Sequence, residues 1–389
     1  MFARCSIGAP RSLRYASNPP SLRARARYNS TAENPKETPD VPRSRLSKRG
    51  LFVAAWTALV VVGGWQVYRY NRKSDAFVAY TLVSKEPVSS TASIFHLEPK
   101  ETSSNFELYK DAWRRGIWNV HFKQPQLQIV RAYTPLPPVD ESTGREKDEL
   151  RFLIRKDPHG EVSSYLHRLP IGAAIEMRGP NLEYELTPDV RQVVFFAGGT
   201  GIAPALQVAH ALFEGNKSEG DNKGLKKLHI LWANRMREDS QGGVSDAPPE
   251  EAVPPKPTWS GLFSRPKAKV LAPRVSHDKG LIVKELDALK QKYPGQVTVE
   301  YFVNAEDTWI DEDAVFRALA RFDDKAFSAG TASTPSEQKQ ILISGPPGFI
   351  SYLAGPKEWR NGREEQGSVS RILAHAISKN PHHVKVWKI

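Results

Sequence analysis

Hydrophobic and polar positions follow three different patterns along the chain, and each pattern predicts a different structure. Residues 50–68 carry no charge and are mostly apolar. Residues 76–186 contain short runs of alternating apolar and polar positions, separated by clusters of Gly, Pro, Asp and Asn. From residue 190 onward, continuous apolar runs alternate with segments of helical periodicity. In order, these patterns predict a membrane span, an antiparallel sheet and a parallel α/β domain.

The uncharged stretch 50–68 predicts a single transmembrane helix. Its 19 residues, at about 1.5 Å of rise each, nearly cross a hydrocarbon core of about 30 Å. Trp65 and Tyr68 suit the membrane interface. Basic residues flank the stretch on both sides, which favours a span over the alternative of a buried core helix.

The region 75–187 is predicted to be a small antiparallel barrel. Its expected strands are 77–83, 117–122, 127–133, 150–154 and 174–177, with one short helix at 163–168.

The region 190–389 is predicted to be a parallel α/β domain. The expected strands are 193–197, 228–233, 297–302 and 341–344, and the expected helices are 202–213, 281–292, 313–320 and 348–353. Residues 240–280 contain a Pro-rich segment, which we interpret as a mobile insertion without a catalytic role.

The turn after the apolar run 193–197 contains the first candidate chemistry. Gly198, Gly199 and Gly201 follow the run directly, and Pro204 fits the first turn of a helix. Strand, glycine turn and helix together favour a bound phosphate, because glycines allow close approach and a helix N-terminus offers free N–H groups. The motif is neither Gly-x-Gly-x-x-Gly nor a P-loop, so a tight turn without a ligand is the alternative.

Charge and cysteine usage exclude several function classes. The formal net charge is +12, but residues 1–49 alone carry eleven Lys or Arg against three Asp or Glu. The predicted domains are therefore nearly balanced, and we expect no nucleic-acid partner. Cys5 is the only cysteine, so no thiolate metal site is expected, and the histidines form no spaced cluster that would predict a bound metal.

The N-terminal composition predicts a mitochondrial address. Residues 1–32 contain six Arg and several Ser but no acidic residue, as is typical of a transit peptide; a disordered basic arm is the alternative. Residues 33–49 are polar and predicted to be a linker. With the span at 50–68, we expect a single-pass protein of the mitochondrial inner membrane, with its soluble domains in the intermembrane space.

Four short motifs carry a family resemblance. They are residues 131–134 (Arg-Ala-Tyr-Thr), 160–163 (Gly-Glu-Val-Ser), 198–204 (Gly-Gly-Thr-Gly-Ile-Ala-Pro) and 344–349 (Ser-Gly-Pro-Pro-Gly-Phe). Through them the chain resembles the ferredoxin-reductase superfamily of FAD enzymes, and within it the NADH–cytochrome b5 reductase branch. The region from residue 352 to the tail resembles a fungal mitochondrial branch linked to haem attachment to cytochrome c.

The resemblance implies an FAD-binding β-barrel followed by a nucleotide-binding α/β domain. FAD would then be held by Arg131, Tyr133, Thr134, Gly160, Val162 and Ser163. Arg131 would grip the pyrophosphate, the Tyr133 ring would stack on the isoalloxazine, and the Thr134 hydroxyl would reach flavin N5. Glu161 departs from the family, which often has a basic residue at this place.

The resemblance also implies a site for NAD(P)H. Its residues would be Gly198, Gly199, Thr200, Gly201, Pro204, Asp239, Ser344, Gly345, Pro346 and Phe349. Thr200 would lie at the junction of flavin and nicotinamide. Asp239 would accept a hydrogen bond from a ribose 2′-OH and so favour NADH, whereas Arg235 and Arg237 leave NADPH possible. Ser344 replaces the family's Cys.

The resemblance implies an enzyme that passes electrons from NADH through FAD to an acceptor. That acceptor would be a separate haem protein or the cytochrome c haem-attachment machinery. The alternative is a flavin-bearing assembly factor for cytochrome c maturation or import, with little turnover of its own.

Overall fold

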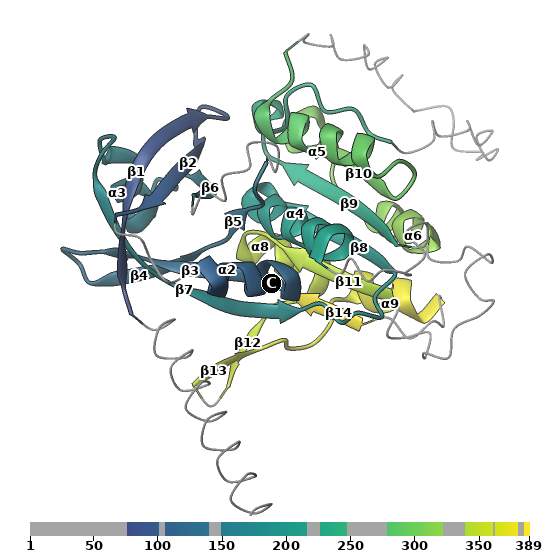
Figure 1. Cartoon of the computed structure of the whole chain (residues 1–389). Helices are drawn as coiled ribbons and strands as arrows, with labels where there is room; N and C mark the ends of the chain where they lie inside the picture. The colour runs from purple at the N-terminus through teal and green to yellow at the C-terminus, as the bar shows by residue number, and fades with distance from the viewer. Residues whose placement is uncertain are drawn as a thin grey trace, which may run out of the picture. The chain divides into compact units, whose positions relative to one another are not determined.

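The computed structural model describes residues 76–100, 106–139, 149–215, 226–246, 278–321, 339–360, 362–379 and 385–389. They form an antiparallel sheet followed by a parallel sheet (Figure 1), which confirms the predicted succession of the two sheet types. The predicted transit peptide, linker and membrane span lie outside the described residues. Among the helices that are described, none is both long and apolar enough to cross a membrane.

The antiparallel sheet has seven strands in the order β4-β3-β7-β1-β2-β6-β5. Their bounds are Val78–Pro87 (β1), Ala92–Pro99 (β2), Gly116–Gln124 (β3), Ile129–Tyr133 (β4), Pro135–Leu136 (β5), Leu150–Arg155 (β6) and Ala174–Glu185 (β7). The two edge strands, β4 and β5, are separated in the chain by Thr134 alone. The sheet is therefore rolled up on itself, as the prediction of a barrel requires.

Two helices accompany this sheet, α2 (Phe106–Arg115) and α3 (Glu161–Arg168). The sequence predicted α3 but neither α2 nor β2. In β2 the alternation is broken, because the adjacent residues Ile94 and Phe95 are both buried and belong to different cores. A strand that is covered on both faces does not show the period of two that identifies a half-exposed strand.

The parallel sheet has five strands in the order β10-β9-β8-β11-β14. Their bounds are Gln192–Gly198 (β8), Lys227–Asn234 (β9), Val297–Val303 (β10), Lys339–Ser344 (β11) and Lys385–Lys388 (β14). Helices α4 (Ile202–His210) and α5 (Leu281–Lys292) pack on one face. Helices α6 (Glu312–Ala320), α8 (Pro347–Ala354) and α9 (Arg371–Lys379) pack on the other.

Short elements complete the described structure. They are the 3₁₀ turns η1 (Gly199–Gly201), η3 (Arg237–Ser240) and η4 (Asn304–Glu306), the π turn η2 (Ala211–Gly215), and the hairpin strands β12 (Glu358–Arg360) and β13 (Arg363–Glu365). The predicted helix 202–213 is thus α-helical only to His210 and continues as a π turn.

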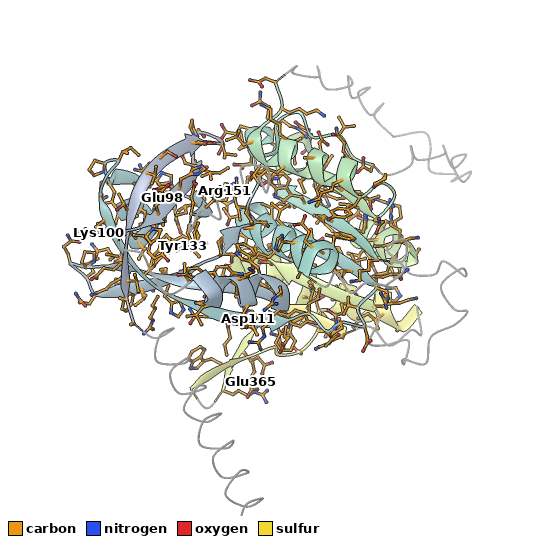
Figure 2. All side chains as sticks on the ribbon, in the orientation of Figure 1. Glu98, Lys100, Asp111, Tyr133, Arg151 and Glu365 are labelled. Atoms are coloured by element: carbon orange, nitrogen blue, oxygen red, sulfur yellow. The ribbon has the colours of Figure 1, made fainter. Side chains whose placement is uncertain are left out.

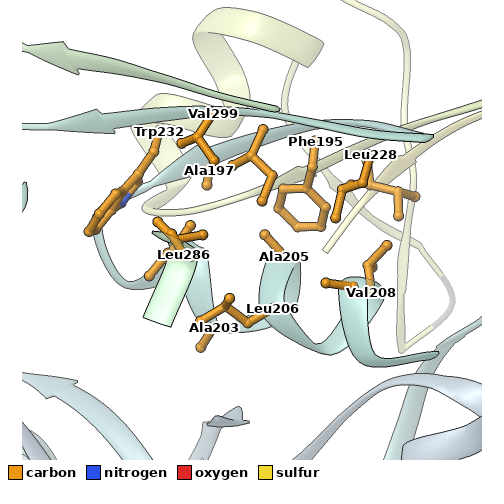
Figure 3. Close-up of a cluster of buried hydrophobic side chains, with 14 of the residues drawn as sticks. Phe195, Ala197, Ala203, Ala205, Leu206, Val208, Leu228, Trp232, Leu286 and Val299 are labelled. Atoms are coloured by element: carbon orange, nitrogen blue, oxygen red, sulfur yellow. The ribbon is translucent and has the colours of Figure 1, made fainter. Parts of the chain in front are cut away.

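A shared core joins the two sheets. On the α4 face, Phe195 and Leu228 of the parallel sheet face Ala205 and Val208 of α4 (Figure 3). The same cluster contains buried residues of the antiparallel sheet: Ile94, Ile117, Leu136 and Leu153. Helix α4 therefore has apolar neighbours in both sheets, which explains why its residues 202–209 are all buried.

The first part of the predicted insertion 240–280 is built onto the sheet. Asp246 accepts from the Val299 N–H at 3.0 Å, its own N–H donates to Val299 O at 2.9 Å, and Ser245 Oγ accepts from the Tyr301 N–H at 2.8 Å. Residues 240–246 thus lie along the edge strand β10. Residues 247–277 lie outside the described structure.

Candidate functional site

The strand order of the parallel sheet locates its candidate binding crevice. Strands β8 and β11 are neighbours, and the order of the chain reverses between them. Ligands of open α/β sheets bind at the carboxyl ends of the strands where this reversal occurs. The motifs Gly198–Gly201 and Ser344–Phe349 stand at the carboxyl ends of β8 and β11, so the fold brings the two predicted nucleotide motifs together.

The two turns contact each other so closely that side chains would not fit between them. A Cβ on Gly201 would lie 2.3 Å from the Ser344 carbonyl oxygen. A Cβ on Gly198 would lie 2.8 Å from the Phe349 ring, and one on Gly345, whose φ is +156°, would lie 3.0 Å from Gly198 Cα. The glycines therefore let the two turns pack backbone against backbone at this edge of the sheet.

The turn itself is held by a tryptophan that the sequence analysis did not single out. Gly199 has a φ of +55°, and its carbonyl accepts a hydrogen bond from Trp232 Nε1 at 2.9 Å. Thr200 lies half-buried in η1, and Pro204 is buried in the first turn of α4. The N-terminus of α4 thus follows directly on the glycine turn, as a phosphate site requires.

Strand β4 presents the predicted flavin residues on one face. Arg131 and Tyr133 alternate with Val130 and Ala132, so they share a face. Tyr133 packs against the core of the antiparallel sheet, with its ring 5.0 Å from that of Phe122. Figure 2 shows Tyr133 among the side chains of this sheet.

The surroundings of Tyr133 and Arg131 differ in polarity. Burial raises the pKa of Tyr133 to about 12, while nearby Arg131 lowers it and Asp157 raises it. The Tyr133 ring is therefore a neutral aromatic surface throughout the physiological pH range. The exposed Arg131 donates to the Val130 carbonyl at 3.0 Å, which leaves other N–H groups of its guanidinium for an anion.

The turn before α3 is stabilised by the hydroxyl that was predicted to hold the pyrophosphate. Ser163 Oγ accepts from the Asp157 N–H and donates to the Gly160 carbonyl, both at 3.1 Å. A Cβ on Gly160 would lie 2.5 Å from this oxygen. Ser163 thus shapes the turn, and the groups that remain to bind an anion are backbone N–H groups such as that of the buried Val162.

The Asp239 carboxylate, predicted to accept from a ribose 2′-OH, is buried and paired with an arginine of the antiparallel sheet. Its side chain is 5% exposed, and its Oδ2 lies 2.7 Å from Nη2 of Arg155 at the end of β6. The same guanidinium borders the glycine turn, 3.8 Å from a Cβ built on Gly199. Arg155, which sequence reasoning missed, therefore joins the antiparallel sheet to Asp239 and to the glycine turn.

Several buried polar atoms near the edge of the sheet that carries the glycine turn have no described partner. They belong to Asn234, Asp239 and Ser240, at or just beyond the carboxyl end of β9, and to Tyr301 within β10. Unpaired buried polar groups are unfavourable, so each of these atoms lacks a hydrogen bond that the described side chains do not supply. They lie toward the same edge of the sheet as the glycine turn, where ligands of such sheets bind.

Gln207 on α4 is a second residue that the sequence analysis passed over. It is fully buried. Its Oε1 accepts from the Trp118 N–H at 2.9 Å, and its Nε2 donates to the Pro135 carbonyl at 3.0 Å. Its only sequence signal is an amide within an apolar helix. Since Pro135 directly follows Thr134, Gln207 fixes the flavin motif relative to the glycine turn.

The part of the chain that the structure describes contains no candidate metal-binding site. No three His, Cys, Asp or Glu side chains there are placed to hold a metal ion.

Comparison with known proteins identifies the antiparallel domain. Residues 79–186 match the family model of the oxidoreductase FAD-binding domain. This chain contains an FAD-binding domain of the oxidoreductase type. The match covers β1 to β7 and therefore confirms the resemblance to FAD-dependent reductases that the motifs at 131–134 and 160–163 indicated.

Relatives extend the similarity into the second domain. NADH-cytochrome b5 reductase 2-A of Vanderwaltozyma polyspora is 23% identical over 252 residues, which cover 64% of this chain and 66% of that protein. The cytochrome c mitochondrial import factor CYC2 of Saccharomyces cerevisiae is 26% identical over 248 residues, covering 50% of this chain and 68% of that protein. The chain thus spans slightly less than two thirds of the reductase's length.

A solved structure with similarity to this chain is the cytochrome b5 reductase domain of Ulva prolifera nitrate reductase. It is 19% identical, covers 72% of this chain and 90% of that domain, and superposes with a TM-score of 0.43.

Proposed function

We propose that this protein is an FAD-dependent NAD(P)H oxidoreductase of the cytochrome b5 reductase type. The observation that carries the proposal is the contact between the glycine turns of β8 and β11 beside an FAD-binding domain. Bound FAD supplies the chemistry, since it accepts a hydride from a nicotinamide and releases electrons singly. The protein's task is to position the two cofactors, so no acid–base pair is needed.

The surroundings of the site residues support the roles that the resemblance implies. The exposed Arg131 pairs with the pyrophosphate, the neutral Tyr133 ring supports the isoalloxazine, and Thr134 lies beside it. Val162, in the first turn of α3, offers its backbone N–H, whereas the Gly160 N–H donates to the Asp157 carbonyl at 3.0 Å and shapes the turn. The glycine turn 198–201 and the Ser344–Gly345 turn support the dinucleotide, with Phe349 packed beneath them.

NADH is the proposed donor. Both carboxylate oxygens of Glu306 accept from the guanidinium of Arg237, which neutralises one of the two arginines that could attract a 2′-phosphate. By resemblance, Asp239 would accept from the ribose 2′-OH of NADH; its carboxylate is buried and paired with Arg155. Relatives named as NADH-dependent reductases support the same donor.

The proposed acceptor is a separate haem protein or the cytochrome c haem-attachment machinery at the mitochondrial inner membrane. One relative is named for cytochrome b5 and another for the mitochondrial import of cytochrome c. The predicted transit peptide and uncharged stretch 50–68 add a single-pass anchor with the domains in the intermembrane space.

Ser344 and the import-factor relative favour a second candidate function. In place of a thiol, Ser344 puts a hydroxyl at the turn that abuts the nicotinamide, where it is buried. A flavin-bearing assembly factor with slow turnover would tolerate this change, whereas a fast reductase would be slowed by it.

Anaerobic stopped-flow spectroscopy of the full-length, detergent-solubilised chain tests both functions. A flavin spectrum that NADH bleaches within about a second, a range typical of enzymes of this kind, supports the reductase. Bleaching over minutes supports the assembly factor, and Ser344→Cys should then accelerate it. Absence of bound flavin from protein refolded or expressed with excess FAD contradicts both proposals.

A further inference from the structure

The most exposed large hydrophobic side chain of the described structure lies on a small hairpin. Trp359 in β12 is 73% exposed. Strand β12 pairs only with β13, so the hairpin forms a two-stranded sheet apart from the two domains. Figure 1 shows it extending below the parallel sheet, and Figure 2 labels its Glu365 there. Tryptophan is enriched at protein contact surfaces and at membrane interfaces, so Trp359 is the starting point for a candidate contact surface.

A buried lysine holds the base of this hairpin. Lys388 is 2% exposed, and its ammonium donates to the carbonyls of Pro356 at 3.1 Å, Gln366 at 2.5 Å and Ser368 at 2.8 Å. These carbonyls lie on both sides of the hairpin in the chain. Gln366 also exchanges side-chain hydrogen bonds with the Lys388 backbone. The hairpin is therefore presented in a fixed orientation.

The hairpin's charges are paired among themselves. Lys357 contacts Glu364 at 3.2 Å, and Arg360 contacts Glu358 at 2.5 Å. Over residues 357–365, three basic residues balance three acidic ones. Such a surface does not select a strongly acidic or basic partner. What it offers is an aromatic ring with polar groups beside it, the combination found at membrane–water interfaces.

The predicted membrane span lies close in the chain to the first described strand. The uncharged stretch ends at Tyr68, and β1 begins at Val78. The nine residues between them reach at most about 30 Å. In Figure 1 β1 starts at the lower left of the antiparallel sheet and the hairpin projects below the parallel sheet. The end of the chain that leads to the predicted anchor and the hairpin therefore share one side of the described structure.

We propose that the β12–β13 hairpin docks on the lipid surface, with Trp359 inserted at the level of the headgroups. The proposal rests on the membrane anchor of the proposed function. It assigns the hairpin a second, shallow membrane contact that fixes how the domains face the bilayer.

A fluorescent label that reports its own environment tests this docking. Full-length protein carrying Cys5→Ser and Trp359→Cys, labelled with NBD, is reconstituted into phosphatidylcholine vesicles with and without doxyl-labelled phosphatidylcholine. Trp309→Cys is the matched control, because Trp309 is also exposed, at 55%. We expect a blue shift and lipid-dependent loss of fluorescence at position 359, and neither at position 309.

The outcomes separate the docking from the anchor and from the enzyme activity. Protein that floats with vesicles but shows no quenching at position 359 overturns the docking and leaves the anchor intact. Equal quenching at both positions also overturns it. A blue shift in vesicles that doxyl-labelled lipid does not quench would assign the hairpin to a protein partner or a second copy instead. Flavin reduction by NADH, measured in parallel, is independent of all these results.

Discussion

At the scale of single residues, the candidate site depends on glycines, whose lack of a Cβ lets two backbone turns come into contact. Gly201 has no space for a Cβ because the Ser344 carbonyl oxygen would lie 2.3 Å from it. Both groups belong to backbone that other elements hold in place, so neither can move without opening the crevice. The turn could be predicted from the sequence because only glycine fits at such positions, and Gly198, Gly199 and Gly201 are therefore visible as a cluster.

Gly201→Ala should therefore damage the site, and Gly348→Ala should not. A Cβ on Gly348, in the first turn of α8, meets nothing within 4 Å, and Ala in a helix is favoured over Gly by about 0.5–1 kcal/mol. We expect Gly201→Ala to lower the unfolding free energy by about 2 kcal/mol and to weaken NADH binding. Urea unfolding and NADH titration measure both. Unchanged NADH binding in Gly201→Ala would contradict the proposed crevice.

Arg131→Ala should weaken FAD binding without a large effect on the fold. Arg131 is exposed, and a hydrogen bond to a charged group contributes about 1.5–3 kcal/mol, or about 10- to 100-fold in affinity. Fluorescence titration of apoprotein with FAD measures the change. Arg168→Ala, an exposed arginine at the end of α3, should leave the affinity as it is; an equal loss in both variants would point to general charge rather than a specific contact.

At the scale of elements, continuous apolar runs such as β8 and segments with a regular period were predictable, whereas β2 and β14, which show neither pattern, were not. Strand β2 escaped prediction because Ile94 and Phe95 face different cores. Strand β14 read as a polar tail, since Lys388 is charged, yet its ammonium is buried against three carbonyls. In both strands tertiary contacts override the local pattern, so no periodicity in the sequence identifies them.

The junction of α4 and α5 should give the protein a measurable pH dependence. The His210 imidazole and the Lys292 ammonium, 3.3 and 2.6 Å from the Glu214 carboxylate, hold the pKa of Glu214 at about 2, below its usual 4.5. A lowered carboxylate pKa stabilises the fold fully above the unfolded-state value, and this stability is lost as the pH falls from about 4.5 toward 2.

Glu214→Gln should accordingly be less stable than the natural protein by about 2 kcal/mol at pH 7, with the difference shrinking below pH 4.5. Urea unfolding at a series of pH values measures this. Glu98→Gln, which removes an exposed carboxylate from β2, is the control and should track the natural protein. A difference that stays constant with pH would mean that packing, and not charge, links the two helices.

At the scale of the whole molecule, polar contacts between the two domains decide how the cofactor sites face each other. Arg155 reaches Asp239 from the antiparallel domain, and Ser90 donates from its hydroxyl and its N–H to Glu238 at 2.6 and 3.1 Å. Sequence analysis found Asp239 but not its partner, because the two residues belong to different domains and nothing local relates them.

The Arg155–Asp239 pair should behave asymmetrically on mutation. Arg155→Gln leaves a buried carboxylate without its counter-ion and should cost about 3 kcal/mol of stability. Asp239→Asn leaves a half-buried guanidinium that water can reach and should cost about 1 kcal/mol. Urea unfolding of both single variants and the double variant measures the coupling.

The exposed contact made by Ser90 is the control, since Ser90→Ala should change stability by less than about 1 kcal/mol. Strictly additive effects would contradict a direct contact.

The position of β8 at the centre of the parallel sheet has a consequence for synthesis and folding. Its neighbours are β9, which follows soon after, and β11, which begins only at Lys339. While the ribosome makes the intervening chain, β8 has one open edge, and its residues 193–197 are apolar on both faces. Pairings between distant segments form slowly, and an open apolar edge is prone to aggregation. We therefore expect the yield of soluble protein to depend on chaperones that bind nascent chains, and to rise when translation is slowed by lower temperature.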